Sequence, residues 1–228
     1  MEPEGEVTGM ELLYSHLGTF SGTAQLLLAL GISLGLRPWP AHPWIRPWMA
    51  SYWISAFTLL ALSMPLVWSA IPLTPLKAPT FPLLNSGFFL SGGLQALGWL
   101  RMRRARLPLV LALVPVGLYL ALFHLLGGAQ EARVRVLLFS SMETLLFGLT
   151  AAWARQGLLR VSPRLARVIP AVLAFHAAFY FVRTGLALFF PSADDYLLSV
   201  AVAMMEGLVF NLALAYLQVV VMMEEEGA

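Results

Sequence analysis

The sequence predicts an all-α fold: an integral membrane bundle of seven transmembrane helices, with the N-terminus outside and the C-terminus inside the cell. Three observations predict it. Apolar residues make up 59% of the chain and charged residues 11%, whereas a soluble domain carries roughly 25% charged residues. Stretches of about 20 largely apolar residues, enough to cross a hydrocarbon core, recur along the sequence. Basic residues favour alternate loops, which sets the orientation.

The apolar stretches are separated by short connections, so we expect residues 1–228 to form a single domain. The predicted spans cover residues 10–36, 48–70, 82–100, 107–127, 132–154, 164–190 and 195–223. Prolines should break the first two gaps, because proline cannot donate a helix hydrogen bond; they are Pro38, Pro40, Pro43, Pro47, Pro72, Pro75, Pro79 and Pro82. Residues 224–228 then form a short cytoplasmic tail without an output domain.

The loops after spans one, three and five contain most of the basic residues. They hold Arg37, Arg46, Arg101, Arg103, Arg104, Arg106, Arg155, Arg160, Arg164 and Arg167. The loops of the other side hold only Lys77, Arg133 and Arg135. Cytoplasmic loops carry the excess of Lys and Arg, so the first set is predicted inside. Six tryptophans are predicted at or near that inner lipid boundary: Trp39, Trp44, Trp48, Trp53, Trp99 and Trp153.

Several classes of function are disfavoured by the residues present. The formal net charge of +2 is too small to indicate a nucleic-acid partner. The absence of cysteine excludes disulfides, thiolate metal sites and a cysteine nucleophile. No phosphate-binding loop, zinc-protease motif or serine elbow occurs, so an enzyme is the less favoured class. We expect no metal and no cofactor: the last span lacks the lysine that retinal needs, and a haem held by His16 and His124 is a minor alternative.

Three ionisable side chains lie deep within predicted spans, where each costs roughly 2.5 to 3.5 kcal/mol. Glu143 and Glu206 each lie about 16 Å below the outer end of their span, and Arg183 about 10 Å below, on a helix of opposite direction. Because side chains lean toward the N-terminus of their helix, the three head groups should converge.

His176 and Tyr180 share the face of Arg183 at helical spacing, which predicts the lining of an outward-opening pocket. The predicted ligand-binding residues are Glu143, His176, Tyr180, Arg183 and Glu206. An equally weighted alternative is that the charges only fix how the helices pack. Proton coupling is a third, less favoured interpretation.

Small and amide side chains should set helix contacts. Gly18 and Gly22, Gly31 and Gly35, and a set in the third span (Ser86, Gly87, Ser91, Gly92 and Gly93) allow close approach. Packing within the bundle is favoured, and a homodimer is the alternative. Asn85, Gln95, Asn211 and Gln218 are expected to bond across helices.

Some stretches match a pattern found in known proteins: Pro82 to Asn85 opening the third span, Gly98 with the basic run after it, Arg133 and Arg135, and Arg183. Over roughly residues 50 to 220 the chain resembles the seven-helix sensory modules of bacterial membrane signalling proteins, such as membrane-anchored diguanylate cyclases. The resemblance implies ligand-dependent helix movement relayed through the last span to a cytoplasmic partner, in a bacterial inner membrane.

These observations favour a non-enzymatic receptor or sensor, with the lipid bilayer as its surroundings and a small molecule as its ligand in an outer-half pocket. The alternatives are a small secondary transporter that uses the buried Glu and Arg residues, or a membrane-embedded enzyme.

Overall fold

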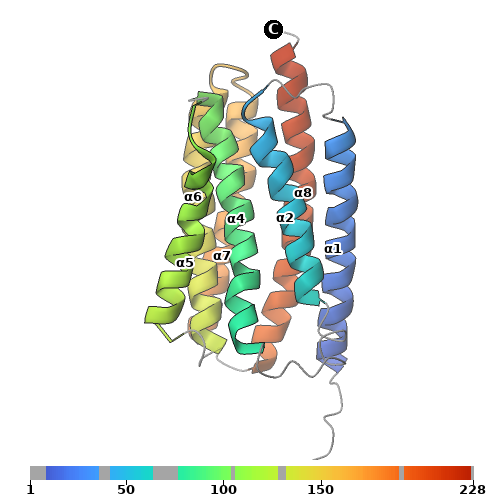
Figure 1. The fold of residues 1–228 in the computed structure, drawn as a ribbon, viewed down its shortest axis with the longest axis vertical. Coiled ribbons are helices and arrows are strands. Elements are labelled where there is room, and N and C mark those ends of the chain that lie inside the picture. The colour runs from blue at the N-terminus through green and yellow to red at the C-terminus, as the bar shows by residue number, and fades with distance from the viewer. Residues whose placement is uncertain are drawn as a thin grey trace, which may run out of the picture.

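In the computed structural model the chain forms a bundle of helices that run side by side along one axis (Figure 1). The structure describes residues 9–35, 42–63, 77–103, 106–127, 132–189 and 193–226. Within these ranges the fold is all-helical, with no β-strand. The predicted fold class is thus confirmed at this level.

A helix lies at each stretch that hydropathy predicts. The helices are α1 (Gly9–Gly35), α2 (Ile45–Ser63), α4 (Lys77–Arg103), the 3-10 helix η2 (Leu109–Leu113) with α5 (Val114–Leu125), α6 (Ala132–Leu158), α7 (Leu165–Phe189) and α8 (Ala193–Glu226). Among the described residues, four segments are long and apolar enough to cross a membrane: His16–Gly35, Arg133–Leu158, Leu165–Phe189 and Val202–Glu225. They indicate a membrane protein.

Three of the predicted proline breaks are wrong. α2 begins at Ile45 and so includes Pro47 in its first turn, where the missing N–H would have no partner in any case. α4 begins at Lys77 and includes Pro79 and Pro82. The Ser86 hydroxyl donates to the Pro82 carbonyl at 2.6 Å. Pro47 and Pro79 lie in first turns, where proline is tolerated. Pro82 is the sixth residue of α4 and removes one backbone hydrogen bond within the helix. All three prolines lie inside helices rather than between them.

The fourth predicted span is not one continuous α-helix. Its first part, η2, follows an extended Pro108, and α5 starts at Val114 with Pro115 in its first two positions. Proline at that position is compatible with a helix start but clashes with the carbonyl four residues earlier. The chain therefore changes from 3-10 to α geometry at this point.

The helices close into a ring. Around the ring, α1 contacts α2, α2 contacts α4, α4 contacts α6, α6 contacts α7, α7 contacts α8, and α8 returns to α1. α5 packs outside the ring against α4 and α6, at one edge of the bundle (Figure 1). This order makes α8 a neighbour both of the helices that carry the predicted site and of those that begin the chain.

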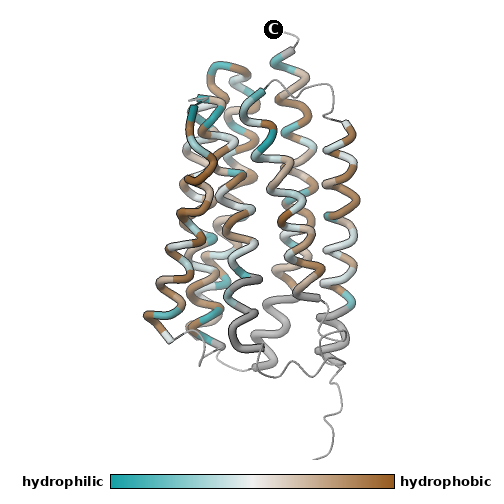
Figure 2. The backbone as a smooth tube through the Cα atoms, in the orientation of Figure 1, coloured by the Kyte–Doolittle hydropathy of each residue, from teal (hydrophilic) through white to brown (hydrophobic). Residues whose placement is uncertain are grey.

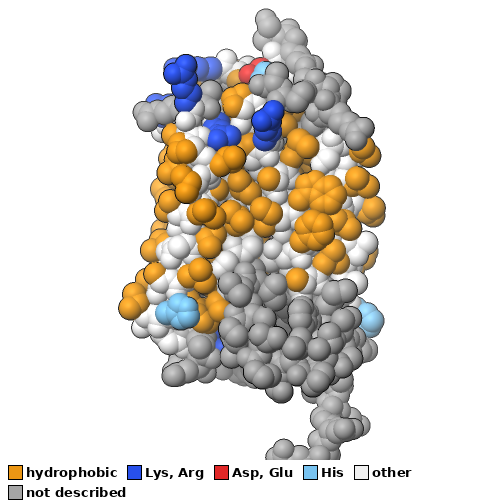
Figure 3. All heavy atoms as spheres, viewed as in Figure 1, with side chains coloured by type: hydrophobic (Ala, Val, Ile, Leu, Met, Phe, Trp, Pro, Cys, Tyr) orange, Lys and Arg blue, Asp and Glu red, His pale blue; other side chains and the backbone are white. Residues whose placement is uncertain are grey.

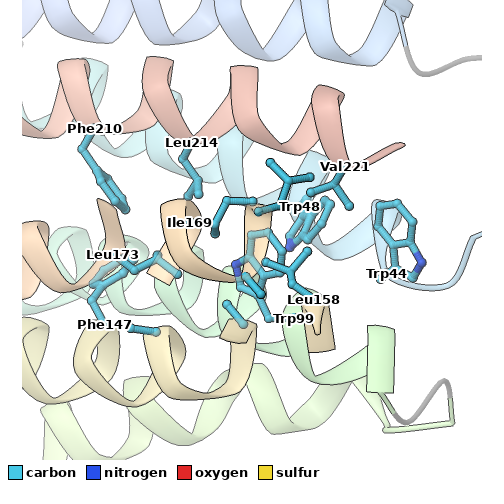
Figure 4. Close-up of a cluster of buried hydrophobic side chains, with 14 of the residues drawn as sticks. Trp44, Trp48, Trp99, Phe147, Leu158, Ile169, Leu173, Phe210, Leu214 and Val221 are labelled. Atoms are coloured by element: carbon cyan, nitrogen blue, oxygen red, sulfur yellow. The ribbon is translucent and has the colours of Figure 1, made fainter. Parts of the chain in front are cut away.

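The largest apolar core lies toward the end of the bundle at which α8 ends, and Figure 4 shows it. Trp48 is 1% exposed and Trp99 is fully buried, with their ring centroids 4.4 Å apart, and Trp44 packs against Trp48 at 4.8 Å. The sequence predicts that these tryptophans face the lipid boundary, and this prediction is wrong for the direction of their side chains. They lie near that end of the helices but pack inward, because a ring of helices leaves room for large side chains in its centre.

The outside of the bundle is apolar along its middle. Figure 2 shows hydrophobic residues along the helices, and Figure 3 shows a belt of apolar side chains, with arginine side chains gathered at the end where the C-terminus lies. Large side chains such as Leu27, Phe175 and Phe181 are 65%, 71% and 68% exposed. An apolar belt of this kind is what a lipid-facing surface requires.

Close helix contacts occur at several of the predicted small residues. A Cβ atom on Gly93 would collide with the backbone carbonyl of Ala112 in η2, and one on Gly87 with Thr58 of α2. These glycines allow the backbones to approach, as predicted. Gly31 and Gly35 differ, since nothing lies within 4 Å of the Cβ position on either.

Candidate functional site

The best-defined polar contact within the bundle joins α7 and α8. Nδ1 of His176 lies 2.7 Å from Oε1 of Glu206. The side chains are 6% and 12% exposed. Both helices are apolar on either side of this pair, so the pair is removed from bulk water.

Aromatic rings hold the imidazole in one orientation. Phe210, one turn after Glu206 on α8, stacks on His176 with centroids 3.7 Å apart and planes at 13°. Phe147 of α6 meets the same ring edge-on at 4.5 Å, and Tyr180 meets it from the next turn of α7 at 5.0 Å. With its ring fixed by these neighbours, His176 presents Nδ1 to Glu206.

The other predicted residues complete a cluster around this pair. Glu143 of α6 is 4% exposed and interacts electrostatically with Glu206, a like charge, and with Arg183, an opposite charge. The Arg183 guanidinium lies 5.8 Å from the centre of the Tyr180 ring and donates to the Ser140 hydroxyl at 3.4 Å. The structure therefore brings all five predicted residues together on α6, α7 and α8.

Only one of the two carboxylate oxygens of Glu206 has a hydrogen-bond partner among the described residues. Its Oε1 atom contacts His176, whereas Oε2 is buried and has no hydrogen-bond partner among the described residues. A buried acceptor left without a partner is costly, more so when the group is charged. The site therefore offers an unused acceptor next to the contact between His176 and Glu206.

A groove of about 830 Å³ lies beside the cluster, between α7 and α8, and is open to the outside of the bundle. Of the five predicted residues only Glu206 lines it. The sequence predicts instead a pocket that opens toward one end of the bundle and is lined by the whole set. Ser140, Phe147 and Phe210 belong to the site and were missed, although each lies three or four residues from a predicted glutamate.

A second polar region lies on the other side of α8. The Tyr52 hydroxyl of α2 donates to Oε1 of Gln218 at 2.8 Å, and Nε2 of Gln218 donates to Oε1 of Gln95 on α4 at 2.8 Å. Nearby, the hydroxyls of Ser51 and Ser91 lie 2.9 Å apart. The predicted role of Gln95 and Gln218 in bonding across helices is confirmed.

The fold rules out a haem held by both His16 and His124. His16 lies on α1 and His124 on α5, which stand at opposite sides of the bundle (Figure 1). No group of three or more His, Asp or Glu side chains that could hold a metal occurs in the described part of the chain.

No protein-family model matches the sequence, and no curated protein or solved structure matches it either.

Proposed function

We propose that this chain is a non-enzymatic sensor module of a bacterial inner membrane that recognises a small ligand at the cluster of α6, α7 and α8. The observation that carries the proposal is Glu206, with one oxygen paired to His176 and the other buried without a partner. A ligand that brings an N–H or O–H donor to Oε2 removes that cost. Such a ligand favours whichever helix arrangement binds it better.

The way in which α8 is connected favours sensing. Glu206 and Gln218 lie on the same helix, 12 residues or about 18 Å apart along its axis. Gln218 bonds to α2 and α4 through Tyr52 and Gln95. A displacement of α8 at the ligand cluster is therefore felt by helices on the far side of the ring, and at the cytoplasmic end where a signalling partner would bind.

We also propose that all seven helices cross the membrane, with the N-terminus outside and the C-terminus inside. The closed ring supports this topology, because α2 and α4 pack between candidate spans and along them. The loops that follow α1, α4 and α6 contain an excess of arginine, and this excess supports the orientation. Reporter fusions at Ala228 should read cytoplasmic, and a periplasmic reading contradicts the proposed orientation.

The ligand itself can be sought by mass spectrometry of small molecules that co-purify with the protein. We expect a compound that is retained by the unmodified chain and lost from Glu206→Gln, which keeps the shape of the side chain but not its charge. Gln218→Leu is the matched control, since it alters a buried polar group of the same helix outside the cluster. Equal retention by all three proteins contradicts a ligand site at Glu206.

Movement can then be measured directly with the compound so identified. The chain contains no cysteine, so cysteines introduced at the exposed Leu159 and Met223, 57% and 63% exposed, carry spin labels without a background. We expect the compound to shift the distance between the two labels in the unmodified site and not in Glu206→Gln. Proton flux into proteoliposomes that Glu206→Gln abolishes would instead assign the cluster to transport.

A further inference from the structure

The groove between α7 and α8 is elongated and almost wholly apolar. Its α7 wall is built from Arg167, Val168, Ala171, Val172 and Phe175, and its α8 wall from Val202, Met205, Glu206, Val209, Phe210 and Ala213. The α8 wall covers 11 residue steps, so the groove runs about 16 Å along the helix. The acidic residue in its lining, Glu206, contacts His176.

The groove lies on the lipid-facing side of two candidate spans. All of its lining residues fall within Leu165–Phe189 and Val202–Glu225, the apolar segments long enough to cross a membrane. Phe175 is 71% exposed and Val209 61% exposed at its rim. In a bilayer the groove is therefore filled by something with a hydrocarbon surface.

One end of the groove is cationic. Arg167 lines it, and Arg164 lies one turn earlier, where its carbonyl accepts hydrogen bonds from the backbone N–H groups of Arg167 and Val168. Within the described residues no ion pair engages either guanidinium. The next acidic residue of α8 beyond the groove, Glu224, comes 11 residues or about 16 Å after Ala213.

We propose that this groove binds one anionic phospholipid, with the phosphate at Arg167 and Arg164 and an acyl chain lying along the groove across Glu206. A basic site between helices at the membrane surface is complementary to an anionic headgroup, and the volume is within the range of ligand pockets. Binding itself does not depend on the proposed ligand cluster. In the proposed topology the start of α7 lies on the cytoplasmic side, so the lipid belongs to the inner leaflet, and this assignment alone rests on that topology.

A second copy of the chain fits the groove less well. Copies related by a two-fold axis along the membrane normal would place both sets of arginines at the same depth in one interface. The like charges would then face each other without a counter-charge. A lipid phosphate supplies that counter-charge.

Native mass spectrometry of the purified protein, with phosphatidylglycerol and with phosphatidylcholine of the same chain length, tests the site. Arg167→Gln should weaken phosphatidylglycerol binding about five-fold, the size expected for one basic residue near a membrane surface, and should reduce the preference for it by the same factor. Arg160→Gln is the matched control, because Arg160 is exposed in the connection between α6 and α7 and does not line the groove. It should leave both affinities unchanged.

Ala213→Trp separates a groove from a charged surface. It should weaken both lipids while Arg167 is retained, because the indole occupies the space of the acyl chain. Ala171→Leu narrows the same groove from α7 and replaces it if the tryptophan variant does not fold. Equal losses in Arg167→Gln and Arg160→Gln, or full binding after the groove is filled, overturn the proposal. So does a dimer that Ala213→Trp dissociates, since a second copy then occupies the groove.

Discussion

Two buried polar regions meet on α8, and they differ in the kind of group that each contains. The region at Gln218 is neutral: a phenol and two amides bond in sequence, and one amide nitrogen, Nε2 of Gln95, is left without a hydrogen bond. The region at Glu206 is ionisable, and its leftover atom is a carboxylate oxygen. An unpaired neutral donor costs about 1 to 3 kcal/mol and an unpaired charged group more. The comparison suggests that the first region holds helices together and the second serves a ligand.

The largest effect is expected at Arg183, whose positive charge opposes the negative charge of Glu143. Arg183→Met should lower the free energy of unfolding by about 3 to 5 kcal/mol, because it leaves buried carboxylates without their counter-charge. Thermal unfolding in detergent measures the loss. The triple variant Glu143→Gln, Arg183→Met, Glu206→Gln should recover most of this stability, since it removes the charges together.

Ligand retention by the triple variant decides between the two interpretations of the cluster. We expect retention to be lost although stability returns. Full retention would show that the charges only fix the packing of α6, α7 and α8, and would remove the difference between the two regions.

A smaller effect is expected at Gln218. Gln218→Leu should cost about 1 to 3 kcal/mol, because it leaves the Tyr52 hydroxyl and the Gln95 amide buried without this partner. Unfolding in detergent is again the measurement, and the double variant with Gln95→Leu should cost less than the sum of the two single changes. Ligand retention should be unchanged. Its loss in Gln218→Leu would mean that the neutral region belongs to the site.

The smallest effect is expected at Ser51, whose hydroxyl meets that of Ser91 between α2 and α4. Ser51→Ala should cost about 0.6 kcal/mol, the average for hydrogen bonds between membrane helices. A shift in the thermal midpoint that matches the Gln218→Leu loss would contradict the view that the neutral region gains its strength from the glutamines.

The positions of the helices could be predicted because a run of about 20 apolar residues favours a long helix. Their ends could not, since Pro47 and Pro115 lie in first turns, where proline is tolerated, and composition does not tell a helix start from a gap. The site residues could be predicted because a charge at membrane depth is conspicuous. One contact could not: the sequence predicts the arginine with the two glutamates, and the structure adds His176 against Glu206. Which residues touch depends on how each helix is rotated about its axis, and spacing within one helix carries no such information.

That rotation gives α8 a further property. Successive residues of an α-helix are offset by about 100°, so the 12 steps from Glu206 to Gln218 amount to three full turns plus about 120°. The two side chains therefore leave the helix in different directions, one toward α7 and the other toward α2 and α4. A translation of α8 along its axis shifts both contacts by the same amount. A rotation of α8 about its axis instead moves Glu206 and Gln218 sideways, away from their partners on different helices. One residue inserted between them changes their relative angle by about 100°. The spacing of 12 residues therefore determines whether both side chains can reach their partners at the same time.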